Sequence, residues 1–392
     1  MREHELSCRL PTFTRRQLFA LAAGMGVGQT ARALPTAPVA VARCADYEPK
    51  RLVETLGRMF DQIGGLERLV AGKTVAVKVN LTGGAHQRLG HTPAELAHWT
   101  HPNVIGAVVY WLGRAGARRI RILESIAYSP EPLEEFMIAA GWEPRDIANA
   151  APRVEFENTS YLGMGKEYKL LRVPGQPHIF PGFLLNHSYA DCDVFVTLAK
   201  LKEHYTAGIT LSLKNSFGIT PTTIYGEAAG IDEPALIPRG GRSMLHRGHR
   251  QPAKPAPPEI DPSSPRDDGY RVPRIVADLA AARPIHLAVI DGITTMTAGE
   301  GPWIRPRDGR RTEVVSPRVL IVGTNPVCTD AVGAAVMGFD PAADRGTPPF
   351  ERCDSTLRLA AAHGIGTYKL DEIEVIGETI DAVRFPFRRV SS

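Results

Sequence analysis

The chain has 392 residues, with 46 lysines and arginines against 42 aspartates and glutamates, and a formal net charge of +4. Five arginines and two glutamates of this balance lie in residues 1–33, so the rest of the chain has a formal charge of only +1. So small a charge gives no overall field to attract nucleic acid or a membrane surface, and we predict no nucleic-acid partner. The roughly 360 residues after position 33 exceed one hydrophobic core, which predicts two lobes or one domain with large insertions.

Residues 1–33 have the features of a twin-arginine signal peptide. Arg15 and Arg16 precede an apolar stretch over residues 18–27, and the segment ends in Ala-Arg-Ala, a small-x-small cleavage site. The apolar stretch is shorter than the about 20 residues that a membrane-spanning helix needs, so we predict no stable membrane anchor. We expect the twin-arginine translocase as a partner and a periplasmic or extracytoplasmic location. An amphipathic N-terminal helix is the alternative interpretation.

Short apolar runs alternate with helical patterns after an N-terminal lead-in segment over residues 34–70. The runs that predict strands cover residues 74–79, 119–123, 194–198, 285–290, 319–322 and 373–376. Apolar residues at helical spacing predict helices over residues 101–115, 274–282 and 329–337. Strands that alternate with helices are typical of a parallel sheet covered on both faces. The predicted fold class is therefore α/β, with a largely parallel, doubly wound sheet and insertions.

Residues 226–273 are rich in proline and poor in apolar residues. They separate an α/β lobe over residues 71–225 from the second part of the α/β domain over residues 274–392. So long an irregular connection is either a lid or a linker. Because it follows the lysine motif described next, we favour a flap over a ligand site, with a disordered insertion as the alternative. Residues 154–183, with short runs broken by glycine and proline, predict an antiparallel excursion or small subdomain.

The stretch most informative about function is KLKEHYTAGITLSLKNSFG, which spans residues 200–218. The buried run 194–198 leads into it, and its later part, residues 209–213, alternates between apolar and polar side chains. Its polar residues of interest are Lys200, Lys202, His204, Lys214 and Asn215. Open α/β sheets present ligand sites outside the carboxyl ends of their strands, so a strand that ends in cations and an imidazole predicts a site for an anion.

Polar side chains also follow the other predicted strands. In chain order they are Lys78, Asn80, Glu124, Asp291 and Asp330. If the sheet is parallel, these groups and the lysine motif meet at one edge. A lysine in a valine-rich strand costs free energy unless its ammonium meets water or an anion, which favours a functional Lys78. Purely structural roles stay open for three other residues: Asp291 as a turn residue, Asp330 as a helix cap, and His101 as the anchor of a turn.

We assign candidate roles by the chemistry of each side chain. The substrate-binding candidates are Lys78, Asn80, Lys200, Lys202, Lys214 and Asn215. The catalytic candidates are His204 and His101, which can change charge near neutral pH, and Asp291, which would orient a histidine. The carboxylates that would hold a divalent metal through oxygen ligands are Glu124, Asp291, Glu300 and Asp330. Glu300 lies in a Gly-Glu-Gly-Pro sequence that indicates a tight turn against a ligand.

Several common sites are absent from the sequence. No GxGxxG follows a strand, and neither GxxxxGK[ST] nor GxSxG occurs, which disfavours dinucleotide-binding, P-loop and α/β-hydrolase interpretations. The cysteines after the signal, at 44, 192, 328 and 353, show no closely spaced pair, so we do not expect an iron–sulfur cluster. Their spacing selects no disulfide partners, and Cys192 and Cys328 lie in apolar, core-like surroundings.

The order of these motifs resembles the domain-of-unknown-function family 362 (DUF362) over roughly residues 70–380. The residues that carry the resemblance are Lys78-Val79-Asn80, His101-Pro102, Lys200-Leu201-Lys202-x-His204, Leu213-Lys214-Asn215-x-Phe217-Gly218, Ile290-Asp291-Gly292, Gly301-Pro302 and Asp330. The resemblance implies an α/β domain. Some members of the family add a ferredoxin-like cluster module, whose cysteines this chain lacks.

Two classes of function fit these observations. In the first, the protein is an enzyme acting on a small anionic substrate, with lysines that neutralise the anion and a histidine as acid or base. Hydrolysis, isomerisation and elimination are all compatible, and metal-assisted hydrolysis is slightly preferred. In the second, the protein is a non-catalytic periplasmic binder of an anion, metal or cofactor. The residues identify neither the substrate nor the oligomeric state.

Overall fold

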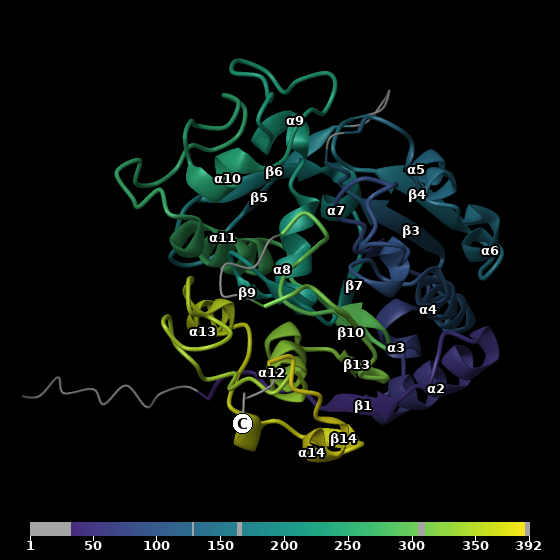
Figure 1. The fold of residues 1–392 in the computed structure, drawn as a ribbon. Coiled ribbons are helices and arrows are strands. Elements are labelled where there is room, and N and C mark those ends of the chain that lie inside the picture. Colours follow the sequence, from purple (N-terminus) through teal and green to yellow (C-terminus); the bar gives the residue numbers. More distant parts are fainter. Residues whose placement is uncertain (1–32, 128, 163–166, 305–309, 389–392) are drawn as a thin grey trace, which may run out of the picture. The chain divides into compact units, whose positions relative to one another are not determined.

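A computed structural model describes residues 33–127, 129–162, 167–304 and 310–388. Within the compact unit Leu34–Ser392, an eight-stranded sheet has the order β14-β1-β13-β10-β7-β2-β3-β4 (Figure 1). The strands are β1 (Val39–Arg43), β2 (Thr74–Lys78), β3 (Arg119–Glu124), β4 (Val154–Asn158), β7 (Val194–Lys200), β10 (Leu287–Gly292), β13 (Val319–Gly323) and β14 (Val375–Gly377). The predicted α/β class with a mostly parallel central sheet is confirmed.

The direction of the strands decides which side chains share an edge. Each neighbouring pair from β10 through β7, β2 and β3 to β4 is parallel, and so is the pair β1–β14. β13 is antiparallel to both of its neighbours, β1 and β10. Its carboxyl end therefore lies at the edge opposite the carboxyl ends of β2, β3, β7 and β10. This orientation takes the residues that follow β13 away from the predicted common edge.

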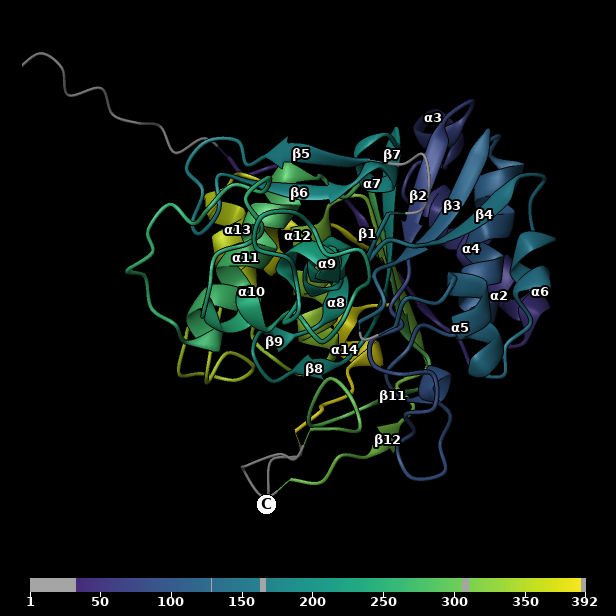
Figure 2. The same cartoon turned by 90° about the horizontal axis from the view of Figure 1, so that it is seen from above.

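Helices cover the sheet on both faces, as Figure 2 shows from above. On one face lie α2 (Pro49–Gln62), α4 (Pro102–Arg114), α5 (Leu133–Ala139) and α6 (Pro144–Ala148). On the other lie α8 (Leu211–Asn215), α11 (Asp268–Ala282), α12 (Pro326–Val336) and α13 (Thr356–Ala362). In β2, Val75 and Val77 belong to the first core and Ala76 to the second, as the two-residue period of a strand requires. A strand buried on both faces must be apolar throughout, which is why these runs could be recognised in the sequence.

Shorter elements complete the described chain. The strands are β5 (Tyr168–Arg172), β6 (Gly182–Asn186), β8 (Glu203–His204), β9 (Gly208–Ile209), β11 (Thr295–Met296) and β12 (Val314–Val315). The α-helices are α3 (Glu67–Val70), α7 (His187–Ala190), α9 (Thr222–Tyr225), α10 (Ser243–Arg247) and α14 (Ile380–Val383), and the 3-10 helices are η1 (Ala94–Leu96), η2 (Ser216–Ile219) and η3 (Leu370–Glu372). None of the helices in the described ranges has the length and apolar character to span a bilayer.

Three segments can now be placed. The lead-in segment is part of the fold, because β1 pairs with β13 and β14 and α2 packs against α4. In the segment 154–183, β4 joins the main sheet as a parallel edge strand, whereas β5 pairs with β6 to form the antiparallel excursion. The proline-rich segment 226–273 contains α10, which packs on α11, and its last six residues form the start of α11, so the predicted boundary at 274 falls inside this helix.

The segment 209–213 alternates between apolar and polar residues, which is the pattern of a strand, but most of it forms α8. Leu211 begins this helix at a φ of 39°, a left-handed conformation that is costly for a branched side chain. The carboxylate of Asp330, on α12, accepts hydrogen bonds from the backbone N–H groups of Ser212 and Leu213, both at 2.8 Å. Contacts from a distant helix therefore override the local alternation.

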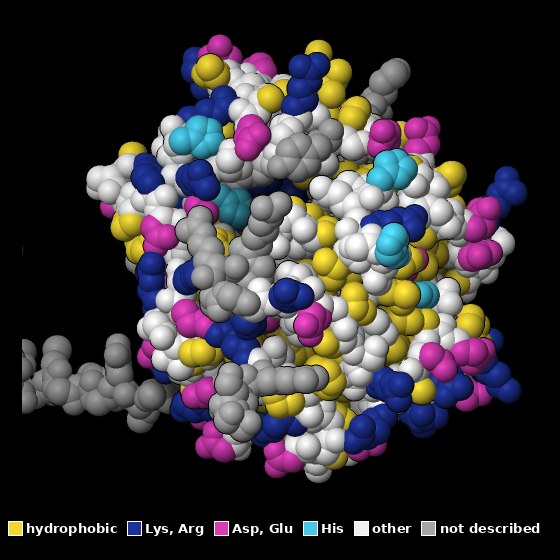
Figure 3. Space-filling model, in the orientation of Figure 1, with side chains coloured by type: hydrophobic (Ala, Val, Ile, Leu, Met, Phe, Trp, Pro, Cys, Tyr) yellow, Lys and Arg dark blue, Asp and Glu magenta, His cyan; other side chains and the backbone are white. Residues whose placement is uncertain are grey.

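Charged side chains of both signs are interspersed on the face shown in Figure 3. This mixture agrees with the small formal charge that remains after residue 33. The four cysteines in the described residues, Cys44, Cys192, Cys328 and Cys353, are buried free thiols, which answers the pairing question left open by the sequence.

Candidate functional site

A cavity of about 590 Å³ opens where β2, β3 and β7 end. The chain runs from β2 to β3 and β4 on one side, then returns to place β7 on the other side of β2. The connections from β2 and β7 therefore diverge, which is where open α/β sheets form ligand sites. The cavity brings together eight of the residues predicted from the sequence: Lys78, Asn80, Glu124, Lys202, His204, Lys214, Asn215 and Glu300.

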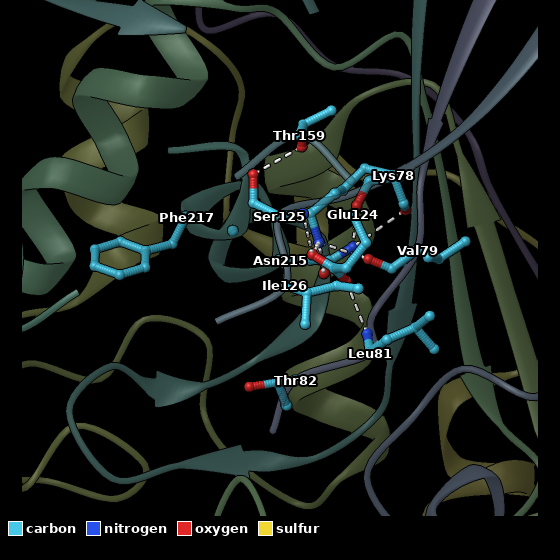
Figure 4. Close-up of polar contacts among 12 residues, drawn as sticks. Lys78, Val79, Leu81, Thr82, Glu124, Ser125, Ile126, Thr159, Asn215 and Phe217 are labelled. Atoms are coloured by element: carbon cyan, nitrogen blue, oxygen red, sulfur yellow. Dashed lines mark hydrogen bonds and ion pairs between the residues drawn. The ribbon is translucent and has the colours of Figure 1, made fainter. Parts of the chain in front are cut away.

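The inner wall of the cavity holds an ion pair between Lys78 and Glu124 (Figure 4). The Lys78 Nζ lies 2.6 Å from Glu124 Oε1 and donates to the Val79 carbonyl, also at 2.6 Å. The other carboxylate oxygen of Glu124 accepts from the backbone N–H of Leu81 at 2.8 Å. Burial lowers the pKa of Lys78, although the adjacent carboxylate opposes this effect. The pair is neutral as a unit, so it adds no net charge to the cavity.

Gly218 makes this pairing possible, because a Cβ at this position would lie 2.9 Å from Lys78 Nζ. We predict that Gly218→Ala displaces the ammonium from Glu124 and lowers the free energy of unfolding by about 1–3 kcal/mol, as overpacking usually does. Urea unfolding measures the change. The matched control is Gly106→Ala in α4, where a Cβ meets open space, and it should stabilise the protein by about 0.5–1 kcal/mol. Equal stability of the two variants would contradict the proposed packing.

Lys202 and Lys214 supply the charge that the cavity can offer to a ligand. The Lys202 Nζ donates to the Glu300 carbonyl at 2.6 Å, and the Lys214 Nζ lies 4.3 Å from the centroid of the Phe217 ring. Among the described residues, none gives the Lys214 ammonium a hydrogen bond or an ion pair. Burial lowers the pKa of each lysine to about 7, with repulsion from neighbouring cations adding to it and Glu300 opposing it. Both lysines are therefore partly protonated near neutral pH.

Arg242 and His246 reach the same cavity from the proline-rich segment. The Arg242 guanidinium donates to the carbonyls of Ser125 at 2.8 Å and Gly218 at 3.2 Å, which connects this segment to the loop after β3 and to η2. Burial and the neighbouring cations lower the pKa of His246 to about 3, so its ring is neutral. Residues of the proline-rich segment therefore line the cavity, whereas its role as a flap stays a prediction.

His204 and Asn80 offer hydrogen-bond donors to a ligand. The Nδ1 of His204 accepts from the backbone N–H of Thr206 at 3.2 Å, and burial with repulsion from Lys214 keeps its pKa well below the usual range. The neutral ring therefore carries its proton on Nε2. The Asn80 amide nitrogen is buried and has no hydrogen-bond partner among the described residues. An unpaired buried donor on a cavity wall is suited to an acceptor atom of a ligand.

Lys200, His101 and Asp291 do not line this cavity. The Lys200 Nζ lies 2.8 Å from Asp291 Oδ2, and both side chains are 0% exposed. His101 is the N-cap of α4, accepts from the Asn103 N–H at 3.1 Å, and stacks on Tyr47. These contacts join the ends of β7 and β10 to α4. They agree with the interpretation of His101 as the anchor of a turn.

The four carboxylates proposed as metal ligands do not converge. Glu124 and Glu300 line the cavity, whereas Asp291 pairs with Lys200 and Asp330 lies against α8. Asp330 follows β13, whose carboxyl end lies at the edge opposite the ends of β3 and β10, and it does not line the cavity. In the part of the chain that the structure describes, these four residues form no group with metal-binding spacing.

The sequence did not single out Arg242, His246 or Trp303, which also line the cavity. The first two come from the proline-rich segment, where the only signal was its position directly after the lysine motif. Trp303 follows the Gly-Glu-Gly-Pro turn that carries Glu300. Long-range folding brings these residues to the cavity, so no local pattern marks them.

The fold and the cavity define an α/β protein with a small-molecule site at the switch point of its sheet. The model of a family described as a domain of unknown function, DUF362, matches residues 75–335. The chain belongs to this family, as its motifs indicated.

One sequence relative and two solved structures are similar to this chain. Thylakoid-associated protein sll1697 of Synechocystis sp. is 25% identical over 303 residues, which cover 72% of this chain and 85% of the relative. A Thermotoga maritima protein of known crystal structure has a TM-score of 0.32 at 13% identity, and the match covers 70% of this chain and 56% of the Thermotoga chain. The lactate racemase apoprotein of Thermoanaerobacterium thermosaccharolyticum has a TM-score of 0.30 at 12% identity, and the match covers 67% of this chain and 50% of the racemase chain. The two structural similarities concern the α/β fold alone.

Proposed function

We propose that the protein is an enzyme that binds a small organic anion in the cavity and transfers a proton on it, as an isomerase or lyase. The observation that carries this proposal is the pair Lys202 and Lys214, two amines with a pKa of about 7 in one cavity. A general acid or base works best when its pKa is near the operating pH.

The charge of the cavity selects the ligand. Lys78 and Glu124 neutralise each other, whereas Lys202 and Lys214 line the cavity together with the carboxylate of Glu300. One oxygen of that carboxylate accepts from the backbone N–H of Tyr205 at 3.0 Å. An anion relieves the repulsion among the cations, so it binds the protonated lysines best. The volume of about 590 Å³ suits a metabolite-sized ligand.

The protonation state of the two lysines supplies the chemistry. Because each has a pKa of about 7, the state in which one is an ammonium and the other a free amine is populated near pH 7. The amine can remove a proton from the substrate, while the ammonium stabilises the negative charge that develops. Metal-assisted hydrolysis, the reaction preferred from the sequence, has less support, because Lys78 and two backbone N–H groups already occupy the Glu124 carboxylate.

The test does not require the substrate to be known beforehand. A thermal-shift screen of carboxylates, phosphates and sugar acids identifies anions that raise the melting temperature. Each hit is then incubated with the protein in D₂O, and NMR detects deuterium incorporated into the ligand. We expect exchange with the wild type and with Lys254→Met, an exposed lysine of the proline-rich segment, and none with Lys202→Met or Lys214→Met.

Two outcomes would contradict the proposal in different ways. Hits that bind the wild type without any proton exchange or turnover would favour a non-catalytic anion-binding protein. If no anion raises the melting temperature, the proposal that the cavity binds a small organic anion is contradicted.

We also propose that the protein is exported by the twin-arginine translocase and acts in the periplasm. The support is the sequence of residues 1–33, with its arginine pair and cleavage site, of which residues 1–32 lie outside the described residues. Replacing Arg15 and Arg16 by lysine should retain the precursor in the cytoplasm, as measured by cell fractionation. Periplasmic recovery of the variant at the wild-type level would contradict this route.

A further inference from the structure

Two histidines and an aspartate form a second cluster, and none of the three lines the cavity. His178 lies between β5 and β6, Asp278 belongs to α11, and His363 follows α13 directly. The side chains of Asp278 and His363 are 0% and 5% exposed, and that of His178 is 23% exposed. The cluster is thus buried on two sides and reachable from solvent beside His178.

Three potential ligand atoms converge in this cluster. The Nδ1 of His178 lies 2.8 Å from Asp278 Oδ1, and the Nε2 of His363 lies 3.0 Å from both of these atoms. Three ligands on one face of an octahedron, each about 2.1 Å from an ion, lie about 3.0 Å apart. The observed triangle has this size. The two rings are perpendicular, at an interplanar angle of 89°, so the ring nitrogens meet without stacking.

Hydrogen bonds within the cluster account for this arrangement less well than a cation does. The same oxygen of Asp278 also accepts from the backbone N–H of His178 at 2.9 Å, so three donors would crowd it. Two ring N–H groups aimed at one oxygen would hold their hydrogens close together, because the nitrogens are only 3.0 Å apart. A cation between the three atoms instead uses the lone pair of each ring nitrogen.

The carboxylate is also held in place from its other side. Asp278 Oδ2 accepts from the backbone N–H of Ile179 at 2.9 Å. Hydrogen bonds of this kind orient a metal-binding carboxylate and are a usual part of protein metal sites.

We propose that His178, Asp278 and His363 bind one divalent first-row transition-metal ion, with two imidazole nitrogens and a carboxylate oxygen on one face of an octahedral site. The ion would crosslink α11, the end of α13 and the loop between β5 and β6. This site uses imidazole ligands, which suit first-row transition metals rather than Mg²⁺ or Ca²⁺. It is independent of the proposed reaction in the cavity.

The test measures Zn²⁺ binding to the untagged full chain by isothermal titration calorimetry after metal removal. We expect one equivalent to bind the wild type, at least about tenfold weaker binding for His178→Gln and for His363→Gln, and loss of this equivalent in the double variant. His249→Gln removes an exposed histidine outside the cluster and should bind as the wild type does. The proposal would be overturned if the wild type binds no Zn²⁺, or if the double variant still binds one equivalent with the affinity of the wild type.

A measurement on the wild type alone covers the case in which a variant does not fold. Added Zn²⁺ should shift the imidazole ¹⁵N resonances of two histidines in slow or intermediate exchange. Co²⁺ should give visible d–d absorption that Zn²⁺ displaces. No imidazole shift on addition of Zn²⁺ would overturn the site, whatever the fate of the variants.

Discussion

Replacing Lys200 with methionine should lower the free energy of unfolding by about 3–5 kcal/mol, because it leaves the buried carboxylate of Asp291 without its cation. The two side chains are 0% exposed and their charged atoms are 2.8 Å apart. Asp291 also accepts hydrogen bonds from the Tyr47 hydroxyl and from the backbone N–H of His101, which is the N-cap of α4. An unpaired Asp291 carboxylate would therefore disturb the start of α4 as well. Urea unfolding, followed by circular dichroism, measures the loss.

The matched control is Lys214→Met. No described residue pairs with the Lys214 ammonium, so its removal leaves no carboxylate without a cation. Because burial already disfavours the charge of this lysine, Lys214→Met should not lower the free energy of unfolding. The double variant Lys200→Met/Asp291→Asn removes both charges and should be more stable than Lys200→Met alone. If Lys200→Met unfolds at the urea concentration of the wild type, the structural role of this ion pair is refuted.

The affinity of the cavity for an anion should fall about 100-fold between pH 6 and pH 8. Lys202 and Lys214 each have a pKa of about 7, so each passes from mostly protonated to mostly neutral over this interval. A ligand that needs a protonated lysine loses about tenfold in affinity for each such lysine. Calorimetric titration of a hit from the anion screen at several pH values measures this slope.

Lys214→Gln should reduce this pH dependence to about tenfold, since one titrating amine remains, whereas Lys254→Gln should leave it unchanged. A second readout needs no ligand. The folded pKa of about 7 lies below the usual 10.5 of lysine, so the unfolded chain binds more protons between these values and stability should rise with pH across that window. A flat affinity profile for the wild type from pH 6 to pH 8 would show that these lysines do not titrate as proposed.

The sequence predicted the inner strands of the sheet because strands buried on both faces are apolar without interruption, but it did not predict β1 or β4 as strands of this sheet. It could not show that β13 runs against its neighbours, since strand direction depends on tertiary pairing. Asp330, which follows β13, does not lie with Glu124 at the cavity. The same residue instead fixes the start of α8, which the alternation of residues 209–213 did not indicate.

The lysine motif was found from the sequence, but its members could not be told apart. Lys200 is the last residue of β7 and its side chain meets Asp291, whereas the chain beyond it leaves the strand and brings Lys202 to the cavity. Alternation along a strand has no predictive value after the strand ends. The cluster of His178, Asp278 and His363 was missed for a related reason, because its members are separated by 100 and 85 residues.

The position of β1 bears on how the molecule completes its fold. In Figure 1 this purple strand lies beside the yellow β14, and its register joins Val39 to Gly323 on one side and to Val375 on the other. The first strand of the sheet thus finds both neighbours only in the last quarter of the chain. Such distant pairings close slowly and late, so β1 cannot take its place in the sheet until the residues of β13 and β14 have been synthesised. Until then the backbone groups of this first strand have no partners in the sheet.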